Sequence, residues 1–244
     1  MSVSRKYLAF RILLINKSGL LIILQHCLAN RARFTHFKFL KPIPPFNFSV
    51  KSRLFLTQYV GRLQLGRRDG LVSSKSHAYG YGKLPHPDFT LADLNAMFGA
   101  NKLTQTDMIA LSGAHTIGFS HCRFFADRIN STPVDPTLNA SYAAQLQNVC
   151  PVNVDPLLVV DMDPSTPRRF DNSYFPALVQ RKGLLKSDSV LFEDEMTRGT
   201  VTKFAQDADA FFKAFVEAML KLGRVGVKTD SQGEIRQDCS RFNS

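Results

Sequence analysis

One histidine, set among apolar residues, is the side chain best placed by type and spacing to do chemistry. Met108, Leu111 and His115 stand at positions i, i+3 and i+7. If a helix begins near Thr106 and its turn continues past Ser112, the imidazole emerges on the apolar face near the helix end. Such a histidine is either a core residue with a satisfied hydrogen bond or a metal ligand. The spacing alone leaves both interpretations open.

A second group of side chains carries oxygen atoms. Asp163, Thr166 and Asp171 form a D-x-x-T-x-x-x-x-D array, and Thr116 directly follows the histidine. Calcium takes six to eight oxygen ligands, and short turn-rich segments can bring them together. The alternative is that the two aspartates only form a turn before Pro164 and cap a following helix.

Several helices must position these residues. Thr104 with Asp107, and Thr90 with Asp93, are capping-box patterns at the starts of two helices, the second of which ends near Gly99. Further along the chain, the patterns predict a helix over 137–149, a turn-rich segment over 160–175, and then a helix that Gly183 ends. Residues 183–192 are predicted to be extended. An amphipathic helix follows over 208–222, and a tail after it has a small hairpin around 232–233.

The sequence around the histidine resembles a segment of a known protein family. Residues 110–125, ALSGAHTIGFSHCRFF, closely resemble the segment that carries the axial histidine in class III (secretory plant) haem peroxidases. The resemblance runs over 62–244 and includes LQLGRRDGLVS and LPHPDFTLADLNAMFGANKL. It implies an all-α, haem-peroxidase-like helical fold, of which this chain would form the proximal domain, on the axial-histidine side of the haem. Most of the distal domain would be lacking.

The resemblance also assigns roles to residues. It makes His115 the axial ligand of haem b, and Asp188, in the segment G-L-x-x-S-D, the carboxylate that accepts the other ring N–H. It implies one calcium site with these ligands: Thr116, Asp163, Thr166, Asp171 and the main-chain carbonyl of Arg169. Pro85 and Phe124 would bind aromatic substrates, and the alternative for both is ordinary packing.

The four cysteines show no C-x-x-C pair, so a zinc site has little support. By the resemblance, Cys122 and Cys150 form a disulfide. Cys239 is either free or paired with Cys27. A disulfide and the N-x-S/T sequons at 130 and 139 suit a secretory route, so the family implies a secreted or vacuolar protein.

The net charge of +11 is concentrated at one end of the chain. Residues 1–68 hold thirteen Lys or Arg and no Asp or Glu. This reads as a targeting or disordered arm, not as a nucleic-acid surface. Residues 1–61 form a basic leader or linker without family resemblance. This segment could be a signal peptide, a transit peptide, or a sequence translated from the wrong start codon. Its apolar runs are too short for a membrane span.

Two functions follow. The first is a haem-dependent peroxidase that uses hydrogen peroxide to oxidise small phenolic donors, as a monomer. The second is a catalytically inactive remnant, or an incomplete gene product, with only the proximal haem and calcium half. The second arises because the family's distal His and Arg, in a segment resembling R-L-H-F-H-D-C, have no counterpart; RFTHFKF at 33–39 has the wrong spacing. His26 and His36 are therefore not assigned as catalysts.

Overall fold

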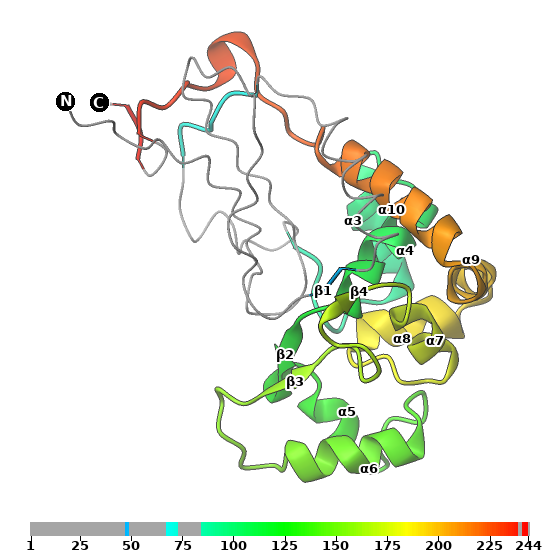
Figure 1. The fold of residues 1–244 in the computed structure, drawn as a ribbon. Coiled ribbons are helices and arrows are strands. Elements are labelled where there is room, and N and C mark those ends of the chain that lie inside the picture. Colours follow the sequence, from blue (N-terminus) through cyan, green and yellow to red (C-terminus); the bar gives the residue numbers. More distant parts are fainter. Residues whose placement is uncertain (1–46, 49–66, 73–83, 239–240, 244) are drawn as a thin grey trace.

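The computed structural model of the 244-residue chain describes residues 47–48, 67–72, 84–238 and 241–243. The described part is mainly helical (Figure 1). Its α-helices are α3 (Leu91–Ala100), α4 (Gln105–Ser112), α5 (Ala126–Asn130), α6 (Ala140–Val149), α7 (Tyr174–Val179), α8 (Lys186–Glu193), α9 (Glu195–Gln206) and α10 (Ala208–Leu222). Its 3₁₀ turns are η1 (Gly113–Thr116), η2 (Cys122–Phe124) and η3 (Asp230–Gln232).

Four short strands accompany the helices: β1 (Asn47–Phe48), β2 (Phe119–His121), β3 (Val159–Asp161) and β4 (Arg169–Phe170). β2 and β3 pair antiparallel, with Ser120 opposite Val160. β1 and β4 pair parallel. Because these pairs are so short, the predicted all-α class is confirmed as a mainly helical fold.

The two capping boxes are confirmed. At the start of α4, Thr104 Oγ1 accepts from the Asp107 N–H at 3.1 Å, and Asp107 Oδ2 accepts from the Thr104 N–H at 2.8 Å. Thr90 and Asp93 form the same reciprocal pair at the start of α3. Each box satisfies two of the N–H groups that a helix start leaves without intrahelical partners. Helix α4 therefore begins at Gln105, one residue before the predicted start.

The larger core lies where α4 meets α10. Met108 and Ile109 of α4 are wholly buried, as is Phe211 of α10. Phe211 lies among neighbouring aromatic rings, with centroids 5.0 Å from Phe175 and 5.9 Å from Phe170. Figure 1 shows α10 alongside α4. Helix α4 leads directly into η1. The apolar stripe of α10 is therefore core, as predicted.

A second core lies under α5 and α6. Phe125, Ile129 and Leu146 are buried there beside the Cys122–Cys150 disulfide, whose S–S distance is 2.08 Å. The predicted pairing of these two cysteines is confirmed.

The prediction that residues 183–192 are extended was wrong. Residues 186–192 belong to α8, because Asp188 Oδ2 accepts the Leu185 N–H at 3.0 Å and thereby caps a helix whose Leu191 is wholly buried. Helix α9, which follows α8, was not predicted.

Other boundaries also differ from the prediction. Helix α6 begins at Ala140 rather than 137, because Asn139 Oδ1 accepts from the N–H groups of Ser141 and Tyr142 and caps it there. Helix α7 ends at Val179, four residues before Gly183. The expected hairpin is absent from the described tail: Asp230–Gln232 form η3, and Glu234 instead makes an isolated bridge to Asp69.

Candidate functional site

His115 lies in η1, the 3₁₀ turn that continues α4 without a break. The residue is 9% exposed. Gly113 of the same turn is in close contact with the core, since a Cβ atom there would lie 2.5 Å from Phe211 and 2.8 Å from Phe175. The absence of a side chain at 113 therefore lets the aromatic core pack directly against the backbone that carries the imidazole.

The His115 ring is held by Asp188 at the start of α8. Its Nδ1 lies 2.8 Å from Asp188 Oδ1, and Asp188 is 2% exposed. Burial acts to raise the pKa of Asp188, but His115 and two further donors outweigh it, so the pKa lies below its ordinary value. Asp188 is thus a carboxylate, and Nδ1 is the nitrogen that carries the proton. In the neutral ring this leaves the lone pair on Nε2.

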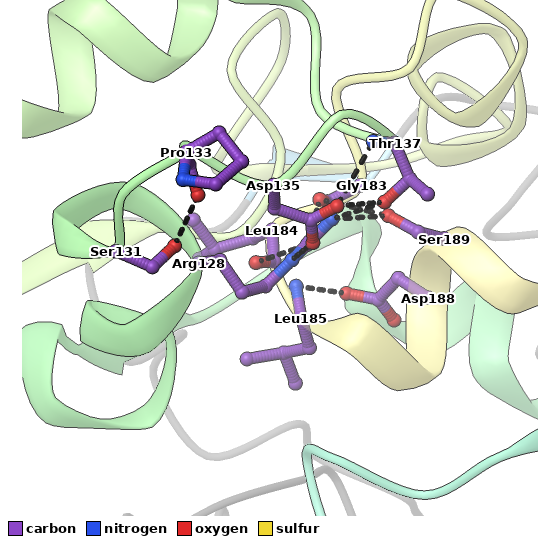
Figure 2. A network of polar contacts seen from close by, with 10 residues as sticks. All are labelled: Arg128, Ser131, Pro133, Asp135, Thr137, Gly183, Leu184, Leu185, Asp188 and Ser189. Atoms are coloured by element: carbon purple, nitrogen blue, oxygen red, sulfur yellow. Dashed lines mark hydrogen bonds and ion pairs between the residues drawn. The ribbon is translucent and has the colours of Figure 1, made fainter.

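The turn that leads into α8 is fixed by Arg128 of α5. The Arg128 Nη1 donates to the carbonyl oxygens of Gly183 at 2.7 Å and Leu184 at 2.8 Å, and Nη2 donates to Ser189 Oγ at 2.8 Å (Figure 2). Its Nε pairs with Asp135 at 2.7 Å. The guanidinium is therefore bonded both before and after Asp188 in the sequence, and Figure 2 shows Asp188 beside this network.

Four oxygen-bearing side chains meet next to the histidine. Thr116 Oγ1 lies 3.1 Å from Asp163 Oδ2 and 3.2 Å from Asp171 Oδ1. Thr166 Oγ1 lies 3.3 Å and 3.1 Å from the same two carboxylate oxygens. The structure thus brings together the four side chains of the predicted calcium set, from η1 and from the segment on either side of β4. We call them the oxygen cluster.

The oxygen cluster contains two carboxylates in a buried setting. Asp163 and Thr116 are both 0% exposed. Burial is the largest influence on Asp163 and raises its pKa above the ordinary value, even though the backbone N–H groups of Ser165 and Thr166 favour the charged form. The nearby Asp171 carboxylate raises it further. A cation placed among these oxygens would relieve both effects.

The fifth predicted calcium ligand is the carbonyl of Arg169. The Arg169 side chain is 55% exposed, and its Nε lies 3.4 Å from Asp171 Oδ2. Its N–H donates to the Thr166 carbonyl at 2.9 Å, which closes a turn around the oxygen cluster. The assignment of its carbonyl stays a prediction.

The two predicted substrate residues belong to different parts of the chain's secondary structure. Pro85 is half-buried in the corner before α3, and the carbonyl of Pro87 in this corner accepts from the Ser187 N–H at 2.9 Å. The corner is thereby attached to the first turn of α8, one residue before Asp188. Phe124 is half-buried in η2, with the Arg123 guanidinium 4.8 Å from its ring centroid. This contact supports the packing alternative for Phe124.

Two residues of the site were missed by sequence reasoning. Tyr174 of α7 donates its hydroxyl to Asp188 Oδ1 at 2.9 Å, and Arg128 makes the network described above. The signal for Arg128 was a single basic residue between the apolar Phe125 and Ile129. Tyr174 carried no signal beyond being an aromatic residue at the start of a helix.

A larger metal-binding group of side chains is absent from the described ranges. No group of three or more His, Cys, Asp or Glu side chains there is placed to hold a metal ion. The oxygen cluster, with two carboxylates and two hydroxyls, is a different kind of donor set, which suits a hard cation such as calcium.

None of the described helices has the length and apolar character that crossing a bilayer requires.

The fold and the site thus define a mainly helical protein with a buried His–Asp pair beside an oxygen cluster. The family model described as "Peroxidase" matches residues 50–207. Peroxidase 73 of Arabidopsis thaliana is 55% identical over 185 residues, and Peroxidase 45 and Peroxidase 16 of the same plant are 51% and 52% identical. Each alignment covers 74% of this chain and 56% to 57% of the relative.

The chain belongs to the peroxidase family, and it spans a little over half the length of these curated relatives. The predicted family is confirmed. The predictions that concern residues 1–46, 49–66 and 239–240 lie outside the described residues, among them the boundary at 61, His26, His36, Cys27 and Cys239.

Proposed function

We propose that the chain is a haem-dependent peroxidase, which uses hydrogen peroxide to oxidise small phenolic donors. The observation that supports this most is the buried His115–Asp188 pair, at 2.8 Å, in a chain of the peroxidase family. Haem b, when bound, would supply the iron that reacts with hydrogen peroxide. The residues fit this group, because Asp188 fixes the proton on Nδ1, so that Nε2 carries the ring lone pair and is the atom that would hold iron.

Three parts of the chain would then have defined roles around the haem. Asp188 orients the ring and, by accepting its N–H, raises the electron density on the imidazole. Arg128 holds the turn from which α8 presents Asp188. The corner containing Pro85 is attached to the same helix, which supports its assignment to donor binding.

Reconstitution with hemin tests the haem proposal. We expect the full chain to give a Soret band and an electron paramagnetic resonance spectrum of imidazole-ligated iron, both lost in His115→Ala. His121→Ala is the matched control, since His121 is also buried but lies in β2. A spectrum that does not depend on His115 would contradict the proposal.

Guaiacol oxidation by the reconstituted chain separates the enzyme from the inactive remnant. Turnover with hydrogen peroxide that is lost in His115→Ala supports the peroxidase. A His115-dependent Soret band without turnover would favour the remnant, a family member that keeps only the proximal half. The observation behind this second candidate is that no segment resembling R-L-H-F-H-D-C is found in the sequence.

We also propose that the oxygen cluster binds one calcium ion. The side chains of Thr116, Asp163, Thr166 and Asp171 and the Arg169 carbonyl would be its ligands. Because Thr116 follows His115 in the same 3₁₀ turn, a bound ion would also stiffen the backbone that carries the haem ligand.

Chelation tests the calcium site. A ligand at 100 times its Kd stabilises the folded state by about 2.7 kcal/mol, so we expect EGTA to lower the Tm by roughly 5–10 °C. Asp163→Asn should abolish this response, whereas Asp161→Asn, which changes an exposed carboxylate on β3, should retain it. An equal response in both variants would contradict the site. Secretion or vacuolar targeting belongs to the same proposal, with the disulfide as its support. The monomeric state is proposed on family resemblance alone.

A further inference from the structure

One oxygen atom of the Asp188 carboxylate accepts hydrogen bonds from two side chains. Asp188 Oδ1 accepts from His115 Nδ1 at 2.8 Å and from the Tyr174 hydroxyl at 2.9 Å. The other oxygen, Oδ2, accepts the Leu185 N–H at 3.0 Å. The histidine and the tyrosine therefore compete for the electron density of the same atom.

Tyr174 is placed so that its hydroxyl has little freedom. It is 2% exposed, its ring meets the His115 ring edge-on at a centroid distance of 5.9 Å, and it makes a second edge contact with Phe175 at 5.1 Å. Burial and the Asp188 charge raise the pKa of Tyr174 well above its ordinary value, so the phenol is a neutral donor. Because the phenol is buried, its hydrogen bond to Asp188 Oδ1 is strong and persistent, and it competes with the hydrogen bond from His115.

We propose that Tyr174 is a positioning residue that sets how much of the Asp188 charge reaches His115. A hydrogen bond to a carboxylate oxygen draws electron density from that oxygen, which weakens the second bond that the oxygen accepts. The Tyr174 hydroxyl thereby limits the electron density on the imidazole. The consequence for iron rests on the proposed haem function, whereas the effect on the imidazole belongs to the chain itself.

A second buried tyrosine shows that packing alone does not require such a bond. Tyr142 of α6 is 5% exposed, and its hydroxyl has no hydrogen-bond partner among the described residues. Burial raises the pKa of Tyr142 most, and the Asp188 charge raises it further. Tyr142→Phe is therefore a matched control for Tyr174→Phe: it removes the same atom from a similar setting without removing a hydrogen bond.

The first experiment uses the full chain without haem, labelled with ¹⁵N-histidine. The His115 ring signals are assigned by their loss in His115→Ala. We expect the Nδ1–H proton to move downfield in Tyr174→Phe, because the bond to Asp188 strengthens, and to stay in place in Tyr142→Phe. An unchanged proton in Tyr174→Phe, or equal shifts in the two variants, would overturn the proposal.

A graded variant makes the test independent of whether Tyr174→Phe folds. Replacing Tyr174 by 3,5-difluorotyrosine keeps the ring and the hydroxyl but makes the phenol more acidic and a stronger donor. The His115 Nδ1–H proton should then move upfield, opposite to its shift in Tyr174→Phe. A downfield shift or none would overturn the proposal.

The second experiment measures the iron–histidine stretching frequency by resonance Raman spectroscopy of the hemin-loaded ferrous chain. We expect a higher frequency in Tyr174→Phe, a lower one with difluorotyrosine, and the wild-type value in Tyr142→Phe. If hemin bound independently of His115, the proposed haem function would be contradicted. The NMR spectra of the haem-free chain would still decide the role of Tyr174. If haem bound through His115 and all four frequencies agreed, the role of Tyr174 alone would be overturned.

Discussion

Arg128 donates from Nη1 to the carbonyl oxygens of both Gly183 and Leu184, at 2.7 and 2.8 Å. Arg128 lies in α5, and the two carbonyls lie in the turn before α8 (Figure 2). These contacts connect the part of the fold that holds the disulfide with the turn that presents Asp188 to His115. The Arg128 side chain is 7% exposed, and the side chain of its ion-pair partner Asp135 is 19% exposed.

Replacing Arg128 should destabilise the fold strongly. In Arg128→Gln, the partly buried Asp135 carboxylate loses its cation, and the carbonyls of Gly183 and Leu184 lose a charged donor. We therefore expect a loss of about 3–5 kcal/mol. Urea unfolding measures it. Arg181→Gln is the control, because that guanidinium is 55% exposed and its pair with Glu193 is long at 3.4 Å; it should cost about 0–1 kcal/mol. Equal losses would contradict the argument.

Adding a methyl group at Gly113 should overpack the core below His115. A Cβ there would lie within 3 Å of both Phe211 and Phe175, so Gly113→Ala is expected to cost about 1–3 kcal/mol. Gly199, in the interior of α9, has no atom within 4 Å of the same position. Gly199→Ala should instead stabilise by about 0.5–1 kcal/mol. Thermal unfolding of the two variants would show opposite shifts, and shifts of the same sign would count against the packing explanation.

The ion pair between α4 and α10 should make stability depend on pH in the acid range. Both oxygens of Asp107 lie 2.8 Å from Lys221 Nζ. Burial acts to raise the pKa of Asp107, but Lys221 and Thr104 outweigh it and hold the pKa below its ordinary value. The folded state then binds its proton less readily than the unfolded state. The resulting stabilisation is complete above about pH 4–5 and is lost as the pH falls through the lowered pKa.

Lys221→Met should reduce the stabilisation at pH 7 and also flatten its decline below pH 4. The measurement is the free energy of unfolding in urea between pH 7 and pH 2.5. Lys213→Met, an exposed lysine on the same helix, serves as the control and should leave the pH dependence unchanged. Parallel curves for wild type and Lys221→Met would show that the pair does not cause the acid decline.

The disulfide should contribute mainly by restricting the unfolded chain. Cys122 and Cys150 are 28 residues apart, and a loop of this size corresponds to on the order of 3 kcal/mol in the chain-entropy account. The double variant Cys122→Ala/Cys150→Ala isolates this bond without reducing any other cysteine. Its urea midpoint should fall accordingly, and an unchanged midpoint would assign the stability to packing instead.

The parts of the fold that sequence reasoning predicted well have local causes. Thr104 with Asp107 marks a helix start through hydrogen bonds three residues apart, and the α10 stripe repeats with the helical period. The pairing of Cys122 with Cys150 and the nearness of His115 to Asp188 came from family resemblance. A separation of 73 residues leaves no local signal for the latter contact.

The failures have a physical reason too. Residues 183–192 were predicted to be extended, yet Leu184 and Leu185 are buried as part of the second core while Asp188 caps a helix. Tertiary packing overrides local pattern there. Tyr174 and Arg128 were missed because their partners are hydroxyls, carbonyls and carboxylates brought together only by the fold.

Because α4 is buried in the core, the position of His115 depends on the cooperative folding of the whole domain. Met108, Ile109 and Ala110 are 0% exposed, and the helix leads into His115 without an intervening loop. Amide protons in such a helix exchange with solvent only through opening events close in free energy to global unfolding. The imidazole should therefore keep its place until the molecule as a whole comes apart, and native-state hydrogen exchange would report both events with one free energy.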